Sequence, residues 1–408
     1  MDESLKPLYS ELKSVAGLVP KKQVLSVLDT VIALYVVTPL TIAHWRGTWE
    51  LVERNRGSFP IWQVFLFASS MYLIFTVARQ SFEDIAGCSG KNLPHKVILF
   101  LSRRLYTYAF ACCSVLHWNS GFNILDTVFE TFLGRMQDRP SEVAYFAIAC
   151  HAMLLISRSY RNILTVPFVI ALDTKSGTFN FPTRFNTKIE EKTTLYVLDC
   201  LFSVFIIGTL VVFVWRGAWV LVDIYLFPEN EYWSAWGSLV LGYTIVAIAF
   251  LLQPMMRWIC DRISGLLRLL VADVFLFFSF VGTVNVWRGI WNLLNLYFLP
   301  ENMELSAWIT HWVCLILLIL LKCSNTLLVR GVYIDADEPA GKCVVFPVYY
   351  LRLIFQRERI KKINKKFQIE AMSRRKIELD NIKIDCSCGT DLKNHITKEN
   401  AQNHSPSQ

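Results

Sequence analysis

Residues 197–219 read VLDCLFSVFIIGTLVVFVWRGAW, and this stretch decides the fold class. Apart from Asp199 its first part is apolar, and it is as long as a helix needs to be to cross a bilayer, about 20 residues. The stretch ends on Trp215-Arg216-Gly217-Ala218-Trp219, where two aromatic residues enclose an arginine and a glycine. We therefore predict an integral membrane protein built from helices.

The composition of the whole chain supports this prediction. Its mean hydropathy is +0.38, and 18% of its residues are charged, whereas soluble proteins contain about 25%. Apolar runs of the same kind recur along the chain. They predict an all-α, polytopic transmembrane bundle with about eight spans, at 24–46, 61–78, 97–118, 142–157, 195–215, 236–256, 270–287 and 307–329.

The distribution of Lys and Arg predicts the orientation of these spans. Basic residues gather in the N-terminal segment, the even-numbered loops and the C-terminal part, whereas the fifth and seventh loops carry only Arg216 and Arg288. Because basic loops stay in the cytoplasm, we expect both termini there. The predicted layout is a cytoplasmic segment at 1–23, four-span halves at 24–190 and 191–350, a basic amphipathic juxtamembrane helix at 351–380 and a disordered tail at 381–408.

The W-R-G-x-W phrase is an internal repeat. It occurs three times, and a fourth, worn copy at Trp118 has one extra residue and no arginine. A proline and another apolar run follow each full copy, which predicts four parallel units of helix, corner and helix. The motif residues expected to form these structural corners are Trp45, Arg46, Gly47, Trp49, Trp118, Trp215, Arg216, Gly217, Trp219, Trp287, Arg288, Gly289 and Trp291.

Two interpretations of the repeated corner remain open. In the first, the tryptophans anchor the helices at the outer membrane boundary, the arginine reaches lipid phosphate or caps carbonyls, and the glycine permits a tight turn. In the second, the arginines line an extracellular vestibule that attracts anions. A further correspondence joins the halves, since 161–182 and 326–347 each combine an apolar stretch, an Asp, a turn with Gly and Phe-Pro.

An acidic residue precedes each full copy. Asp29 and Asp199 lie 16 positions before their tryptophan and Asp273 lies 14 before its own. This spacing places them near the cytoplasmic edge, where a structural role as a cap or polar contact is favoured. The alternative is a membrane polar site that relays ions or protons, because acids within spans are candidates for function.

The sequence predicts no enzyme. It contains no Walker loop, H-E-x-x-H or G-x-S-x-G motif and no metal-ligand spacing, so we expect no catalytic residue, cofactor, metal or nucleic-acid partner. The basic run at 352–376 is interspersed with apolar residues. It predicts a helix that lies on anionic lipid, with a merely solvated helix or a calmodulin target as alternatives.

The repeated W-R-G-x-W copies resemble those of the Fuseless family of animal membrane proteins, over residues 20–350. This resemblance implies a presynaptic plasma-membrane protein that organises the active zone and places voltage-gated calcium channels, with those channels or active-zone proteins as partners. It supplies no catalytic residue. The residues themselves leave a second hypothesis, a transporter or channel for an ion or small solute that uses Asp29, Asp199 and Asp273.

Overall fold

The computed structural model describes residues 22–375, except 88–92, 174–177, 189–191, 337–340 and the single positions 347, 349, 352, 353 and 357. The chain divides into two compact units, Met1–Tyr350 and Leu351–Gln408. The second unit contains a helix over 358–375. The predicted segment at 1–23 lies almost wholly outside the described residues, and the predicted tail at 381–408 lies entirely outside them.

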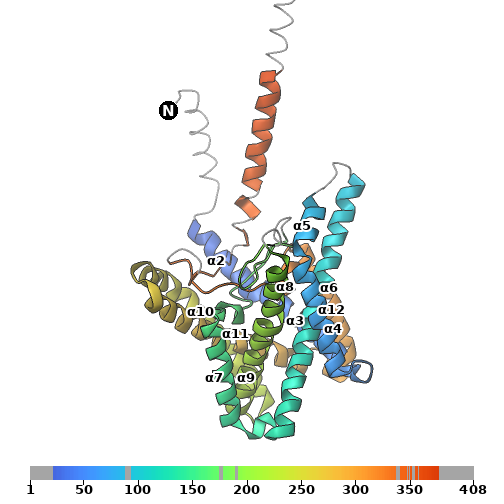
Figure 1. Ribbon diagram of the computed structural model, residues 1–408, viewed down its shortest axis with the longest axis vertical. Coiled ribbons are helices and arrows are strands. Elements are labelled where there is room, and N and C mark those ends of the chain that lie inside the picture. Colours follow the sequence, from blue (N-terminus) through green and yellow to red (C-terminus); the bar gives the residue numbers. More distant parts are fainter. Residues whose placement is uncertain are drawn as a thin grey trace, which may run out of the picture. The chain divides into compact units, whose positions relative to one another are not determined.

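Helices occupy all eight predicted ranges, and the described residues contain no strand (Figure 1). The all-helical prediction is confirmed. Within the part of the chain that the structure describes, five helices are long and apolar enough to cross a membrane, and a sixth qualifies if Ile61–Val77 and Arg79–Ile85 are joined across a bend of 53°. The helices are α2 and α3 (Lys22–Ile32 and Thr38–Arg54), α4 (Ile61–Val77), α5 (Arg79–Gly87), α6 (Leu93–Phe132), α7 (Pro140–Ile156), α8 and α9 (Thr193–Leu201 and Thr209–Tyr225), α10 (Glu231–Arg262), α11 (Gly265–Tyr297) and α12 (Met303–Leu320).

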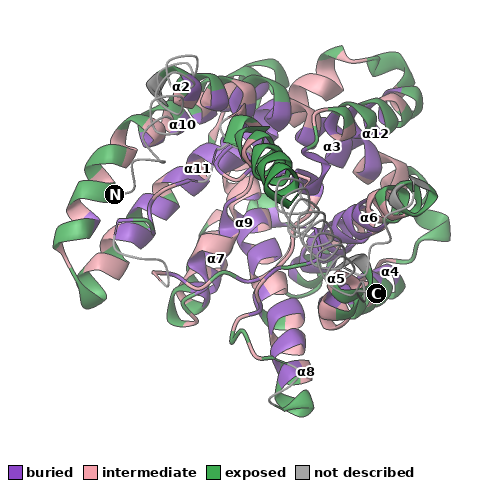
Figure 2. Ribbon diagram, turned by 90° about the horizontal axis from the view of Figure 1, so that it is seen from above, coloured by how far each residue is buried: buried purple, intermediate pink, exposed green. Residues whose placement is uncertain are grey.

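The helices of the first unit pack as an inner and an outer set. The inner set is α3, α6, α9 and α11, which carry the repeated motif and contact one another in a closed cycle. The outer set is α4, α7, α10 and α12. The closest pairs are α6 with α4, α9 with α7, α11 with α10 and α3 with α12 (Figures 1 and 2). The contact between α11 and α3 closes the inner cycle, and α12 packs on α3 from the outer set.

The motif does not form corners, so that part of the prediction is wrong. Helix α3 continues through it to Arg54, α9 to Tyr225 and α11 to Tyr297. The first tryptophan of each copy is buried, so it does not belong to an aromatic belt facing lipid. The predicted ends also shift. Helix α6 runs beyond 118 to Phe132, and α12 ends at Leu320 instead of 329.

The motif glycines lie where two helices approach closely. A Cβ atom on Gly289 would lie 2.6 Å from the backbone nitrogen of Leu239 on α10, and one on Gly47 would lie 2.6 Å from the carbonyl oxygen of Ala307 on α12. At Gly217 the nearest atom, the Cβ of Ala147 on α7, would lie 3.1 Å away. Small residues permit such backbone contact between helices in a membrane. The glycine therefore serves the packing of an inner helix on an outer one.

Candidate functional site

Four tryptophans from the four inner helices form a closed aromatic ring. Trp45 and Trp287 lie 5.6 Å apart between ring centroids, as do Trp287 and Trp215, and Trp215 and Trp118. Trp118 and Trp45 close the ring at 5.7 Å. Each pair meets edge to face, at 72–88°, the geometry that aromatic quadrupoles favour. We call Trp45, Trp118, Trp215 and Trp287 the tryptophan ring.

A second aromatic layer lies one helical turn further along each inner helix. Trp49 contacts Phe122 at 5.2 Å and Trp291 at 5.7 Å, and Trp291 contacts Trp219 at 5.9 Å. These residues follow the members of the tryptophan ring by four positions. Because both layers have the same order, the four inner helices run in the same direction.

The motif arginines link each inner helix to its neighbour. Arg288 donates to Asp223 at 2.6 Å, and Arg216 makes two bonds of 2.8 Å to Asp126. Arg46 donates to Asn295 at 2.6 Å. In the worn copy Asn119 stands in place of the arginine and donates to Glu53 at 2.7 Å. The four contacts therefore run around the whole cycle of inner helices.

This cycle explains the recurrence of the arginine and does not support the anion vestibule. Arg46 is fully buried and Arg288 is 4% exposed. Arg288 also donates to Ser234 at 2.7 Å and to Ser238 at 2.6 Å, both on α10. A buried guanidinium with a carboxylate and hydroxyl partners fixes the position of neighbouring helices and leaves little capacity for an external anion.

The sequence analysis did not identify the hydrogen-bond acceptors of this cycle, although their position in the repeat is regular. The acceptor always lies eight positions after the first tryptophan of its own copy. These residues are Glu53, Asp126, Asp223 and Asn295. Extending the alignment of the copies beyond the W-R-G-x-W phrase would have revealed the position.

Each half of the chain contains a short 3-10 turn that is bound by a residue of the other half. They are η5 (Tyr160–Ile163) and η8 (Ser324–Leu327). The carboxylate of Asp335 accepts from the backbone N–H groups of Tyr160 at 2.6 Å and Arg161 at 2.8 Å. Burial raises the pKa of Asp335, and these N–H groups oppose that rise.

The reverse contact is also present. Asp173 of the first half accepts from the backbone N–H groups of Ser324 at 3.2 Å and Asn325 at 2.8 Å, at the start of η8. Arg104 of α6 also pairs with Asp173. Each half therefore supplies the carboxylate that begins the turn of the other half. Asp173 is the acid of the first of the two corresponding stretches of sequence, and Asp335 is the first of the acids in the second.

Replacement of Asp335 tests this exchange. We expect Asp335→Ala to destabilise the protein by about 2 kcal/mol or more, because two buried N–H groups would lose their acceptor. Asp335→Asn keeps one acceptor oxygen and should have a smaller effect. Thermal unfolding of the purified protein measures both, with Asp138→Ala as the control at an exposed ion pair. Equal stability of Asp335→Ala and Asp138→Ala would contradict the assignment.

Three members of the tryptophan ring donate from their indole nitrogens to these turns or to the segment that follows η5. Trp45 Nε1 donates to the carbonyl of Leu327 at 3.1 Å, and Trp215 Nε1 donates to that of Ile163 at 2.9 Å. Trp287 Nε1 donates to the carbonyl of Val166 at 3.0 Å. Trp118 differs, since its Nε1 has no hydrogen-bond acceptor among the described residues.

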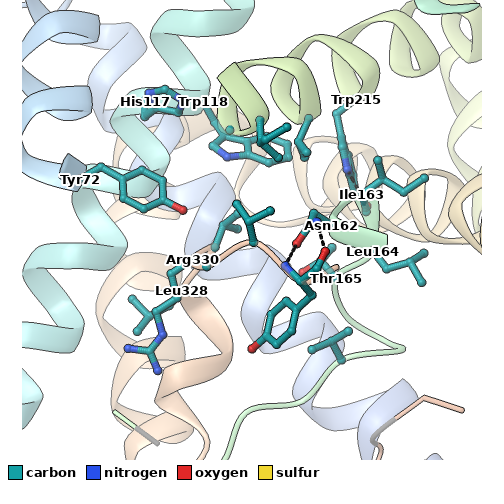
Figure 3. A pocket seen from close by; sticks show the side chains of 18 of the residues that line it. Tyr72, His117, Trp118, Asn162, Ile163, Leu164, Thr165, Trp215, Leu328 and Arg330 are labelled. Carbon is teal, nitrogen blue, oxygen red and sulfur yellow. Dashed lines mark hydrogen bonds between the residues drawn. The ribbon is translucent and has the colours of Figure 1, made fainter. Parts of the chain in front are cut away.

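A cavity of about 450 Å³ lies between the tryptophan ring and the segments that follow the two turns (Figure 3). Its floor is fixed by Asn162 and Tyr333, which exchange two hydrogen bonds of 2.8 and 2.9 Å across the halves. Its volume falls within the range of small-molecule sites, about 300–1,000 Å³. Besides the two aromatic layers, its lining includes Tyr72, His117, Arg161, Phe181, Ser203, Ile207, Asn325 and Arg330.

The three aspartates of the predicted polar site are buried, but they do not meet in this cavity. Asp199 accepts hydrogen bonds from Thr183 at 2.7 Å and from the backbone of Phe185 at 3.0 Å and Thr187 at 3.1 Å, so it fixes the loop before α8. Asp273 has one carboxylate oxygen without a hydrogen-bond partner. Among the described residues no group of His, Cys, Asp and Glu has the arrangement of a metal site.

Comparison with known proteins identifies the family. The family model described as Fuseless matches residues 24–328, which include the four inner helices and all copies of the motif. No curated protein and no solved structure matches the chain. The match covers well over half of the sequence and agrees with the resemblance seen in the repeated motif. This chain therefore belongs to the Fuseless family.

Proposed function

We propose that this protein is a non-enzymatic organiser of the presynaptic plasma membrane that places voltage-gated calcium channels at the active zone. Family membership is the observation that carries the proposal. The fold is consistent with it, since the buried polar groups of the inner helices bond to one another and to the turns. Such a rigid framework suits a protein that acts by holding partners.

The proposal includes eight spans in four parallel two-helix repeats. Helices α6 and α7 are not among the helices that are long and apolar enough to cross a membrane, and α7 has only 17 residues. Both nevertheless pack with helices that qualify, α6 on α9 and α7 on α9. The two aromatic layers, to which all four inner helices contribute at the same level, favour the repeat. We place the protein in the plasma membrane with both termini in the cytoplasm.

The functional proposal is tested by removing the protein from neurons. Calcium-channel density at release sites and the presynaptic calcium signal should both fall, and the full chain should restore them. Surface abundance is measured in the same cells, so that a loss of protein is distinguished from a loss of role. Normal channel density after complete removal would contradict the proposal.

Orientation is tested by engineered glycosylation. A sequon placed between Pro228 and Trp233, in the loop before α10, should be glycosylated, because we place this loop outside the cell. A sequon placed at 184–188, in the loop before α8, should remain unmodified. The opposite result would show that the orientation is reversed. Electrophoretic mobility before and after glycosidase treatment measures glycosylation at both sequons.

The second unit is proposed to bind anionic lipid. The helix over 358–375 carries basic residues together with Ile360, Phe367 and Ile369, whose side chains are 48–57% exposed. A peptide of 354–376 should bind vesicles containing phosphatidylserine and be released by salt, because the Debye length is only about 10 Å at 0.1 M. Equal binding to neutral vesicles would contradict the electrostatic part.

A transporter or channel is the second candidate, and the cavity is the observation that favours it. The tryptophan ring, whose members contact one another edge to face, argues against an open conduit along the inner helices. The aspartates on which this candidate first rested do not line the cavity. Substrate-dependent flux in liposomes containing the purified protein would favour transport over organisation.

A further inference from the structure

A groove of about 430 Å³ lies between α10 and α11, on the surface of the first unit. Every described residue that lines it is apolar, and two of them, Leu270 and Val274, are 52% and 70% exposed. The hairpin that joins the two helices, coloured yellow in Figure 1, lies at the edge of the unit. Because both helices are long and apolar enough to cross a membrane, this groove opens toward the acyl chains of the surrounding lipid.

Arg268 lies at one end of this groove. Val271 and Phe275 line the groove and follow Arg268 by three and seven positions, so the three side chains share one face of α11. Across the interface Arg268 interacts electrostatically with Cys260, which follows the groove residue Met256 by four positions on α10. The groove therefore ends at a cation, on the side of the membrane where we place the cytoplasm.

The guanidinium of Arg268 is available to a ligand. It makes no ion pair and no hydrogen bond with any residue that the structure describes, and its Nε is buried without a partner. The side chain as a whole is half-buried, so its two terminal nitrogens keep accessible surface. The acid at this end of α10, Asp261, pairs instead with Arg257, at 4.0 Å. An arginine without an acid favours an anion, and its planar fork matches the oxygens of a phosphate.

We propose that the groove between α10 and α11 binds one anionic phospholipid of the cytoplasmic leaflet, with an acyl chain between the helices and the phosphate at Arg268. The inference rests on the proposed placement of the hairpin on the cytoplasmic side. Anionic lipids are concentrated in that leaflet, and basic pockets between spanning helices on that side bind their head groups. The site differs from the basic helix over 358–375, because it holds the chain as well as the head group.

Native mass spectrometry of the full chain in detergent tests the proposal by measuring the affinity for the first bound lipid. The probes are dioleoylphosphatidylserine, which is anionic, and dioleoylphosphatidylcholine, which has the same chains and no net charge. We expect phosphatidylserine to bind about tenfold more tightly, which corresponds to about 1.4 kcal/mol, because the choline ammonium neutralises the phosphate beside Arg268. Equal affinity for the two lipids overturns the proposal.

The first pair of variants separates Arg268 from the other basic residues. Arg268→Gln should weaken binding of phosphatidylserine about tenfold and leave that of phosphatidylcholine unchanged. Arg262→Gln is the matched control, because it removes an equal charge from the same hairpin. Arg262 lies over the ring of Trp258, at 3.9 Å, and does not line the groove. If Arg268→Gln folds and keeps the affinity of the wild type for phosphatidylserine, the assignment is wrong.

The second pair of variants tests the groove itself. Val274→Trp fills the groove and should weaken binding of both lipids, whereas Leu251→Trp, at a position on α10 that is 78% exposed and outside the lining, should not. Thermal unfolding in the same detergent checks that each variant folds, and Val274→Trp decides if Arg268→Gln does not fold. A reversed glycosylation pattern would contradict the leaflet, and unchanged affinity in the groove variants would contradict the site, so the two failures are distinguishable.

Discussion

Gly289→Ala is expected to prevent accumulation of folded protein. The added Cβ atom would lie 2.6 Å from the backbone nitrogen of Leu239 and 2.7 Å from its Cα, and a helix backbone cannot yield as a side chain can. Helices α10 and α11 would have to separate along their interface, at a cost of about 3 kcal/mol or more. The amount of monodisperse protein extracted from membranes, relative to wild type, measures the effect.

The motif itself contains the control. At Gly217 the nearest atom to an added Cβ is a single side-chain carbon of Ala147, at 3.1 Å, so Gly217→Ala should be mild. At Gly47 the nearest atoms again include backbone, and Gly47→Ala should resemble Gly289→Ala. Similar yields of the Gly217 and Gly289 variants would show that the close approach of α10 and α11 is not what requires glycine.

Asp223→Leu is expected to cost about 3–5 kcal/mol, because it leaves the buried guanidinium of Arg288 without its carboxylate. Asp223→Asn keeps an acceptor for the 2.6 Å bond and should cost much less. Thermal unfolding in one detergent compares the two variants. Asn119→Ala, at the position of the cycle without arginine, should be milder than Asp223→Leu.

A double variant distinguishes an ion pair from simple packing. Replacing a buried pair by apolar residues is often tolerated, so Asp223→Leu with Arg288→Met should recover much of the stability lost in Asp223→Leu alone. If the loss of stability in the double variant equals the sum of the losses in the two single variants, the two residues act independently. In that case the ion pair between α9 and α11 does not stabilise the cycle of inner helices.

The recurrence of Trp, Arg and Gly pointed to the right residues but to the wrong local structure. Hydropathy falls at Arg216 and Arg288, which suggested that the helix ends there. The true ends lie closer to Pro228 and Pro300, after α9 has reached Tyr225 and α11 has reached Tyr297. A polar residue within an apolar helix looks like a helix end unless its partner is known. The partner of Arg288 is Asp223, which lies on the neighbouring helix α9 and cannot be inferred from the sequence around Arg288.

The cavity could not be predicted for a similar reason. Its floor joins Asn162 to Tyr333, and its walls come from helices that are adjacent only after the chain has closed on itself. Sequence patterns report which face of a helix is apolar, but not which other helix covers it. The correspondence between 161–182 and 326–347 did mark the two stretches that meet there, without revealing that each completes the other.

Because the halves exchange carboxylates, the turn of the first half can be completed only after the second half has been synthesised as far as Asp335. Tyr160 leaves the ribosome 175 positions before Asp335, which at about 5–20 residues per second is a delay of about 9–35 s. During that interval the first half has been synthesised, but its turn lacks the carboxylate of Asp335. A nascent chain that pauses or stops before Asp335 would therefore present an incomplete first half to the quality-control machinery. Conversely, two separately translated fragments, divided between the halves, have the complementary parts needed to rescue each other.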